Sequence, residues 1–132
     1  MEQNRITLDA HTLIWYFHTE SNIKLSQKAL TVIMEAEESG IIYVPSVAML
    51  EILRLIEKGK FPLSYDDLLF HIEQSIAYNL ISLDNELLKT VPDVTDRLEL
   101  HDRVIVATAI FTDTFLVSKD IKISKVYDRV IW

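Results

Sequence analysis

The feature that most constrains the fold of this chain is the alternation of short apolar runs with longer segments of helical spacing. The runs that indicate strands are 6–8, 41–44, 80–83, 115–117 and 130–132. Helices are expected between them over 10–17, 27–38, 47–58, 65–74, 85–91 and 102–110. Strands that alternate with helices form a parallel sheet covered on both faces. The sequence therefore predicts a three-layer α/β/α domain around a central, mostly parallel twisted sheet.

The length of 132 residues and the residues between the predicted elements favour one domain over 1–132. No repeat, low-complexity tract or linker divides the chain. Four predicted helices are preceded by a side chain that can accept hydrogen bonds from the free N–H groups of the first turn. These predicted N-caps are Ser26, Ser46, Ser64 and Asp84.

Composition excludes several classes of site. The chain has no cysteine, which excludes disulfides, zinc–thiolate sites and thiol nucleophiles, and its two glycines cannot form a phosphate-binding loop. The apolar runs are far shorter than the ~18–20 residues of a membrane span. The first nine residues lack the apolar stretch of a signal peptide, so a cytoplasmic protein with no membrane role is expected. The net charge of −7 would by itself argue against a nucleic-acid partner.

Two acidic residues follow predicted strands. Asp9 comes directly after the strand 6–8, and Asp120 comes three residues after the strand 115–117. Ligands of parallel sheets bind beyond the carboxyl ends of the strands, so both positions favour a functional site. Each also has an ordinary explanation, because Asp9 can cap the helix behind it and Asp120 can be a surface loop residue.

Two further acidic residues share a helix face with apolar side chains. Glu51 stands three residues after Ala48 and next to Ile52, on the face predicted to be buried. A buried carboxylate is costly without a cation or hydrogen bonds, although a salt bridge to Arg54 is the simpler alternative. Asp102 heads the inward stripe of its own helix, where a first-turn acid is also structurally ordinary.

The joint placement of these four carboxylates predicts a metal site. Four like charges cannot share a pocket without a counter-ion. Oxygen ligands without cysteine or clustered histidine suit Mg²⁺ or Mn²⁺. Such an ion favours attack of water on a phosphoryl centre.

Four sequence blocks resemble the PIN-domain nucleases and, among them, the VapC-like toxins of toxin–antitoxin pairs. The blocks are LDAHTLIW at 8–15, PSVAMLEI at 45–52, DRVIVATA at 102–109 and LVSKD at 116–120. Each block is short, but together they occur in the family's order and extend over nearly the whole chain.

The resemblance implies a PIN-like fold and Mg²⁺- or Mn²⁺-dependent hydrolysis of RNA phosphodiester bonds by an endoribonuclease. It also implies a homodimer that a cognate antitoxin holds in check. Carried over by position, the residues that would bind the metal and carry out catalysis are Asp9, Glu51, Asp102 and Asp120. Ser118 would support the site by hydrogen bonding near Asp120, and Glu99 would keep an acid at an additional family position.

Other residues near these blocks have open roles. His11 can contact the site, cap a helix or face a partner, and His101 can be a surface residue beside the site. Arg103 can pair with acids or reach phosphate. Leu50 and Leu53 form a second apolar edge of their helix, which predicts a homodimer or antitoxin contact there.

The alternative interpretation is a receiver-like phospho-acceptor signalling domain with an acidic Mg²⁺ pocket. A receiver has paired acids after its first strand and a phosphorylatable Asp after its third. Here Asp9 is unpaired and Glu51 lies in a predicted helix. A phosphatase with a D-x-D-x-T motif is less favoured still, because His11 stands where the second Asp belongs.

Overall fold

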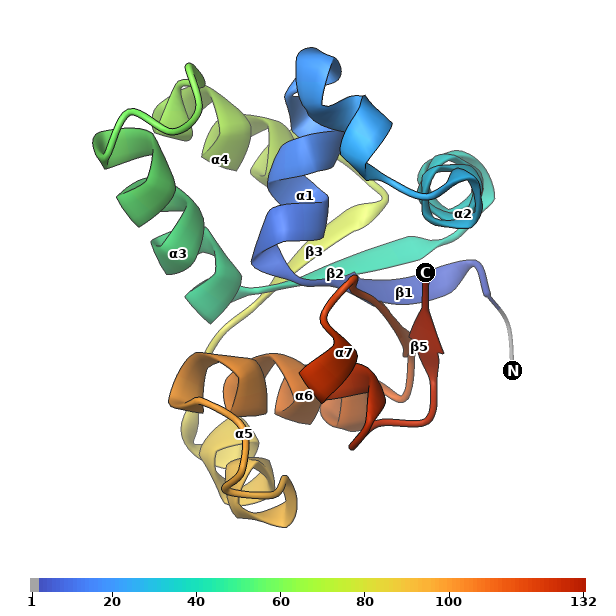
Figure 1. Cartoon of the computed structure of the whole chain (residues 1–132), viewed down its shortest axis with the longest axis vertical. Helices are drawn as coiled ribbons and strands as arrows, with labels where there is room; N and C mark the ends of the chain where they lie inside the picture. Colours follow the sequence, from blue (N-terminus) through green and yellow to red (C-terminus); the bar gives the residue numbers. More distant parts are fainter. Residues whose placement is uncertain (1–2) are drawn as a thin grey trace.

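Five parallel strands form the centre of the structure, a computed structural model that describes residues 3–132 (Figure 1). The strands are β1 (Arg5–Leu8), β2 (Ile41–Pro45), β3 (Tyr78–Ile81), β4 (Phe115–Val117) and β5 (Val130–Ile131). They lie in the order β3-β2-β1-β4-β5, and every neighbouring pair is parallel. The predicted parallel sheet is confirmed.

Helices cover both faces of this sheet (Figure 1). One face carries α1 (Ala10–Phe17), α2 (Gln27–Ser39), α3 (Ser46–Glu57) and α4 (Tyr65–Gln74). The other carries α5 (Asn85–Thr90), α6 (Leu100–Thr112) and α7 (Ile121–Ser124), and two 3₁₀ turns complete the chain, η1 (Thr19–Lys24) and η2 (Val91–Asp93). The three-layer α/β/α architecture is therefore confirmed. Within residues 3–132, no helix is long and apolar enough to cross a membrane.

The sheet separates two hydrophobic cores. Ile6 and Leu8 of β1 point into the core beneath α1 to α4, whereas Leu116 of β4 points into the core beneath α5 to α7. Thr7 alternates with the two apolar residues of β1, and its hydroxyl lies 2.7 Å from that of Thr114. Thr7 is fully buried, and this contact satisfies its hydroxyl on the second face of the strand.

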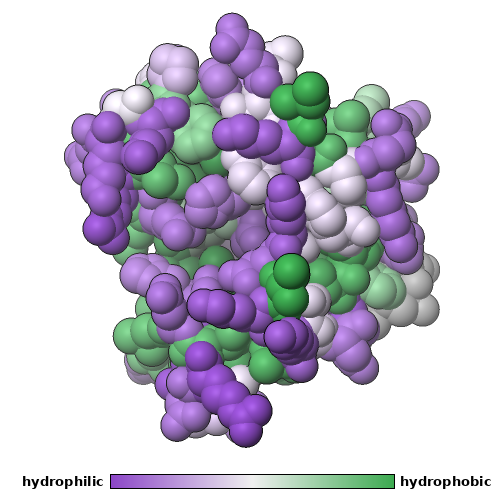
Figure 2. Space-filling model, in the orientation of Figure 1, coloured by the Kyte–Doolittle hydropathy of each residue, from purple (hydrophilic) through white to green (hydrophobic). Residues whose placement is uncertain are grey.

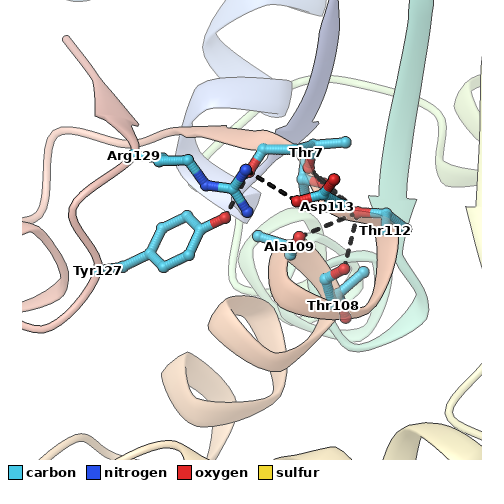
Figure 3. Close-up of polar contacts among 8 residues, drawn as sticks. Thr7, Thr108, Ala109, Thr112, Asp113, Tyr127 and Arg129 are labelled. Atoms are coloured by element: carbon cyan, nitrogen blue, oxygen red, sulfur yellow. Dashed lines mark hydrogen bonds and ion pairs between the residues drawn. The ribbon is translucent and has the colours of Figure 1, made fainter. Parts of the chain in front are cut away.

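A polar network ties the end of α6 to the amino ends of β4 and β5 (Figure 3). The Thr112 hydroxyl donates to the carbonyl of Thr108 at 2.8 Å and also lies 3.3 Å from the hydroxyl of Thr7. Asp113 then turns the chain with a φ of 54°, and its carboxylate pairs with Arg129 at 2.9 Å. These contacts fix where β4 begins and hence where the loop after it emerges.

The predicted helix caps are confirmed with one exception. Ser46 is the first residue of α3 rather than its N-cap, because Pro45 occupies the cap position and no side chain caps this helix. The side-chain oxygens of the other three predicted caps accept backbone N–H groups at 2.9–3.2 Å, and these caps are Ser26, Ser64 and Asp84.

Two predicted elements, α6 and β3, had both ends wrong by two residues. The helix α6 begins at Leu100 with Glu99 at its N-cap position, which places Asp102 in the first turn instead of at the start. The strand β3 occupies 78–81 rather than 80–83. Among the described strands it pairs only with β2, so it is an edge strand. An edge strand tolerates exposed polar residues, which break the apolar pattern expected of a buried strand.

Candidate active site

The strand order creates a natural binding crevice. From β1 the chain builds outward through β2 to β3, and then returns to the other side of β1 to form β4 and β5. The connections that leave β1 and β4 therefore run to opposite faces of the sheet. Parallel sheets bind ligands at such a switch point, outside the carboxyl ends of the two central strands. Asp9 follows β1 at this edge, and Ser118 to Asp120 follow β4.

Asp9 is held rigidly at this position. Its carboxylate accepts a hydrogen bond from the backbone N–H of Thr12 at 2.9 Å, and its own N–H lies 3.4 Å from the carbonyl of Val117. Only 8% of Asp9 is exposed, and this burial raises the pKa of its carboxyl, although hydrogen bonds with Ser118 and Thr12 oppose the shift. Asp9 thus caps α1, which confirms the first interpretation, and it also lies at the switch point, where its functional role stays a prediction.

One cavity of about 650 Å³ collects the predicted acidic residues. Figure 2 shows hydrophilic residues around a hollow in the face where α3 and α6 approach each other. The carboxylates that line the cavity are Asp9, Glu51, Glu99, Asp102 and Asp120, and both His11 and His101 line it as well. Residues far apart in the sequence are therefore brought together as predicted.

Mutual repulsion among these acids is visible in the properties of Asp102. Burial raises the pKa of its carboxyl, and the negative charges of Asp120, Glu51, Glu99 and Asp9 raise it further, to about 6. All four charges act on one carboxyl because α3, α6 and the ends of β1 and β4 converge there. The cluster is therefore strained electrostatically in the absence of a cation.

Ser118 and Asp120 form a compact turn after β4. The buried hydroxyl of Ser118 accepts the N–H of Asp120 at 3.1 Å, and the Asp120 carboxylate accepts the N–H of Lys122 at 2.8 Å. Ser118 also bonds with Asp9, so one hydroxyl contacts the two strand-end acids. This is the hydrogen-bonding position near Asp120 that was predicted for Ser118.

Arg103 does not reach the site, contrary to the interaction with acids or phosphate considered from the sequence. Arg103 does not line the cavity, and its guanidinium donates to the carbonyls of Val94 at 3.2 Å and Val91 at 3.5 Å. Its contacts tie the start of α6 to η2. Arg103 therefore has a structural role that sequence spacing did not indicate.

The sequence reasoning did not place three charged or aromatic side chains on the cavity: Trp15, Lys119 and Lys122. Lys119 lies inside the fourth sequence block, between Ser118 and Asp120, and this position was the available signal. The ring of Trp15 lies 5.5 Å from that of His11 and 6.1 Å from that of Trp132, between centroids. The cavity wall is thus partly basic and aromatic.

The donor set fits a hard divalent cation, although the acids are spread around the cavity. Among residues 3–132, no three His, Asp or Glu side chains are already arranged to hold a metal ion. Mg²⁺ does not require such a cage, because it keeps several waters and uses one or two protein carboxylates. Five carboxylates on one cavity, with the pKa of Asp102 raised to about 6 by its neighbours, are consistent with that mode of binding.

The comparison with protein families decides the classification. The PIN domain family model matches residues 6–129. The chain belongs to the PIN-domain family. All four predicted acids of this PIN domain lie within the matched residues, which contain β2, β3, β4 and all of β1 except its first residue.

Solved structures share the fold of this PIN domain at low sequence identity. A chain from a structure of VapBC2 of Rickettsia felis bound to a DNA fragment from their promoter superposes with a TM-score of 0.71 and 12% identity, over 97% of each chain. A chain from a toxin–antitoxin complex of Klebsiella pneumoniae superposes with a TM-score of 0.59 and 16% identity, over 96% of each chain. No curated protein sequence matches the chain significantly.

The raised pKa of Asp102 predicts a pH-dependent stability of the metal-free protein. The folded-state pKa of about 6 lies above the ordinary value of 3.8 for an aspartate, so the folded state binds the proton more tightly. Stability should therefore rise as the pH falls from 7 to 5. Because Asp102 is only half-buried, we expect a screened contribution of about 1 kcal/mol. Urea unfolding of the wild type and Asp102→Asn at both pH values isolates this contribution, and an identical pH response of the two proteins would contradict it.

Proposed function

We propose that this PIN domain is a Mg²⁺- or Mn²⁺-dependent endoribonuclease that hydrolyses RNA phosphodiester bonds. The observation that carries the proposal is the cavity at the switch point, where carboxylates from α3, α6 and the ends of β1 and β4 repel one another. Family membership supports a nuclease, and it favours this interpretation over the receiver-like alternative.

In this proposal Asp9, Glu51, Asp102 and Asp120 hold one or two ions. An ion held by these carboxylates would supply an activated water and would offset the charge that develops on the phosphoryl oxygens. The hydrogen bonds of Asp9 with Thr12 and of Asp120 with Lys122 fix two of the carboxylates before any ligand arrives. Ser118 links the two segments, because its hydroxyl accepts the backbone N–H of Asp120 at 3.1 Å and also hydrogen-bonds with the Asp9 carboxylate.

The proposed activity is tested by incubating the purified protein with single-stranded RNA and with DNA of the same sequence. We expect RNA to be cleaved internally with Mg²⁺ or Mn²⁺ and to remain intact with EDTA. Cleavage that persists in EDTA would contradict the metal requirement. Cleavage of DNA alone would contradict the assignment of the substrate.

We further propose that this nuclease is the toxin of a toxin–antitoxin pair and forms a homodimer. One structure of similar fold is a toxin–antitoxin complex and the other is VapBC2 bound to promoter DNA, and the shared fold supports a partner of this kind. The exposed side of α3 supports a protein contact, because Leu50 is 62% exposed on the same helix that carries Glu51. Leu53 is half-buried beside it.

A charge on this side of α3 should weaken the dimer. We expect Leu50→Glu to raise the dimer dissociation constant at least about tenfold, because it places a carboxylate in an apolar contact. Light scattering over a range of concentrations measures the mass. Ile76→Glu is a matched control, since Ile76 is fully exposed outside α3. An unchanged mass of Leu50→Glu, or a monomeric wild type, would contradict this interface.

A further inference from the structure

Two ammonium groups line the acidic cavity without being paired to it. Lys119 and Lys122 both contribute to the cavity wall. Within residues 3–132, neither forms an ion pair with a carboxylate, although five carboxylates line the same cavity. Lysines whose role is to neutralise neighbouring acids would be expected to contact them. Both positive charges therefore remain available to a ligand.

The local structure determines where these lysines lie. Lys119 falls between Ser118 and Asp120, whose turn is closed by the hydrogen bond from the Asp120 N–H to the Ser118 hydroxyl. Lys122 follows in the first turn of α7, where its backbone N–H donates to the capping carboxylate of Asp120. The same turn that fixes the acid therefore places a cation on each side of it in the sequence.

An aromatic ring holds the first of these cations. The Nζ atom of Lys119 lies 6.0 Å from the centroid of the Trp15 ring, and the Nζ atom of Lys24 lies 5.9 Å from the same centroid. A cation near an aromatic face is attracted by the ring, so its side chain loses less freedom when it binds a ligand. Trp15 itself packs against the core beneath α1 to α4. The Trp15 ring thus lies near one lysine of the cavity wall, Lys119, and one outside it, Lys24.

Resting on the proposed nuclease function, we propose that Lys119 and Lys122 are positioning residues that bind backbone phosphates of single-stranded RNA on both sides of Asp120. A strand that enters a cavity lined by carboxylates, in a protein of net charge −7, needs local cations to hold its phosphates. The two lysines supply these contacts, while the carboxylates remain free for the divalent ion. The contacts act on the backbone and so carry no base preference of their own.

The test compares Lys119→Gln/Lys122→Gln with the wild type in two assays. In EDTA, fluorescence anisotropy of a labelled single-stranded RNA 12-mer measures binding as a function of salt concentration. In Mg²⁺, steady-state cleavage of the same RNA gives kcat and KM. We expect RNA affinity to fall and KM to rise about tenfold, with kcat within about twofold. The slope of log affinity against log salt should become shallower by about 0.7 for each lysine removed.

Two further variants separate charge from side-chain shape. Lys119→Arg/Lys122→Arg should retain most of the affinity, because the charges are kept. Lys125→Gln is a matched control, since Lys125 is exposed just after α7 and does not line the cavity. All variants are compared by thermal unfolding, so that a loss of folding is not taken for a loss of binding.

The outcomes distinguish this inference from the proposed function. If the wild type cleaves RNA and the double glutamine variant keeps its KM and salt slope, the lysine assignment is wrong and the nuclease stands. A fall in kcat with unchanged KM would indicate that the lysines act in the chemical step beside the carboxylates. That result would also overturn the proposal that they bind backbone phosphates. If the wild type binds RNA through these lysines but does not cleave it with Mg²⁺ or Mn²⁺, the proposed catalysis fails while the binding site remains.

Discussion

Replacing Asp9 with Asn is expected to lower kcat/KM for RNA cleavage by more than about 100-fold while the protein stays folded. Outer partners of a metal site typically contribute 10–100-fold, and a carboxylate proposed to hold the ion should contribute more. Asn can still accept the N–H of Thr12 that Asp9 accepts at 2.9 Å, so the cap of α1 is kept and only the charge is lost. Cleavage of RNA in Mg²⁺ measures the effect.

Asp84→Asn is the matched control for this substitution. Asp84 caps α5 with the same geometry, accepting the N–H of Leu87 at 2.9 Å, but it does not line the cavity. We expect this variant to cleave RNA like the wild type and to unfold at a similar temperature. Full activity of Asp9→Asn, or an equal loss in Asp84→Asn, would remove Asp9 from the proposed site.

Replacing Gly40 with Ala is expected to destabilise the protein by about 3 kcal/mol, because overpacking against backbone cannot be relieved by a rotamer change. A Cβ atom at this position would lie 1.8 Å from the carbonyl oxygen of Asn4. That oxygen is fixed, since it accepts the N–H of Ile41 at 2.8 Å where β1 and β2 begin to pair. Urea unfolding measures the loss.

Gly59→Ala provides the comparison, because Gly59 has a positive φ angle and no close neighbour, whereas Gly40 has a close neighbour. Gly59 has a φ of 75°, and a Cβ atom there would meet nothing within 4 Å. Only backbone strain should result, which we expect to cost about 1 kcal/mol. Equal losses at the two positions would show that the contact between Gly40 and Asn4 does not control the start of the sheet.

The sequence was sufficient to predict the layers and most helix ends, because these depend on local signals. A side chain such as Ser26 or Asp84 caps a helix through residues three positions away. Where the deciding interaction is not local, prediction failed. The helix α6 begins at Leu100, and Glu99 at its N-cap position makes no capping hydrogen bond. The strand β3 includes the exposed Asn79 because it is an edge strand. Neither feature has a signal in the neighbouring residues.

The four acids were predictable for a related reason. Asp9 and Asp120 follow strands, and parallel topology alone brings strand ends together. Lys119 and Lys122 were not predicted, since lysines after a strand are common on any surface and only the folded turn places them on the cavity. Arg103 was misjudged because its partners are carbonyl groups of η2, which no side-chain pattern reveals. Their roles in catalysis and binding stay predictions until the variants are measured.

The contact between Trp15 and Trp132 has a practical consequence. These are the two tryptophans of the chain, and their ring centroids are 6.1 Å apart. Because Trp15 lines the cavity and lies beside Lys119, the whole intrinsic tryptophan emission of the protein originates next to the proposed site. A ligand that displaces Lys119 from the ring changes the environment of this emission. The protein therefore contains its own optical reporter of cavity occupancy, and titrations need no attached label.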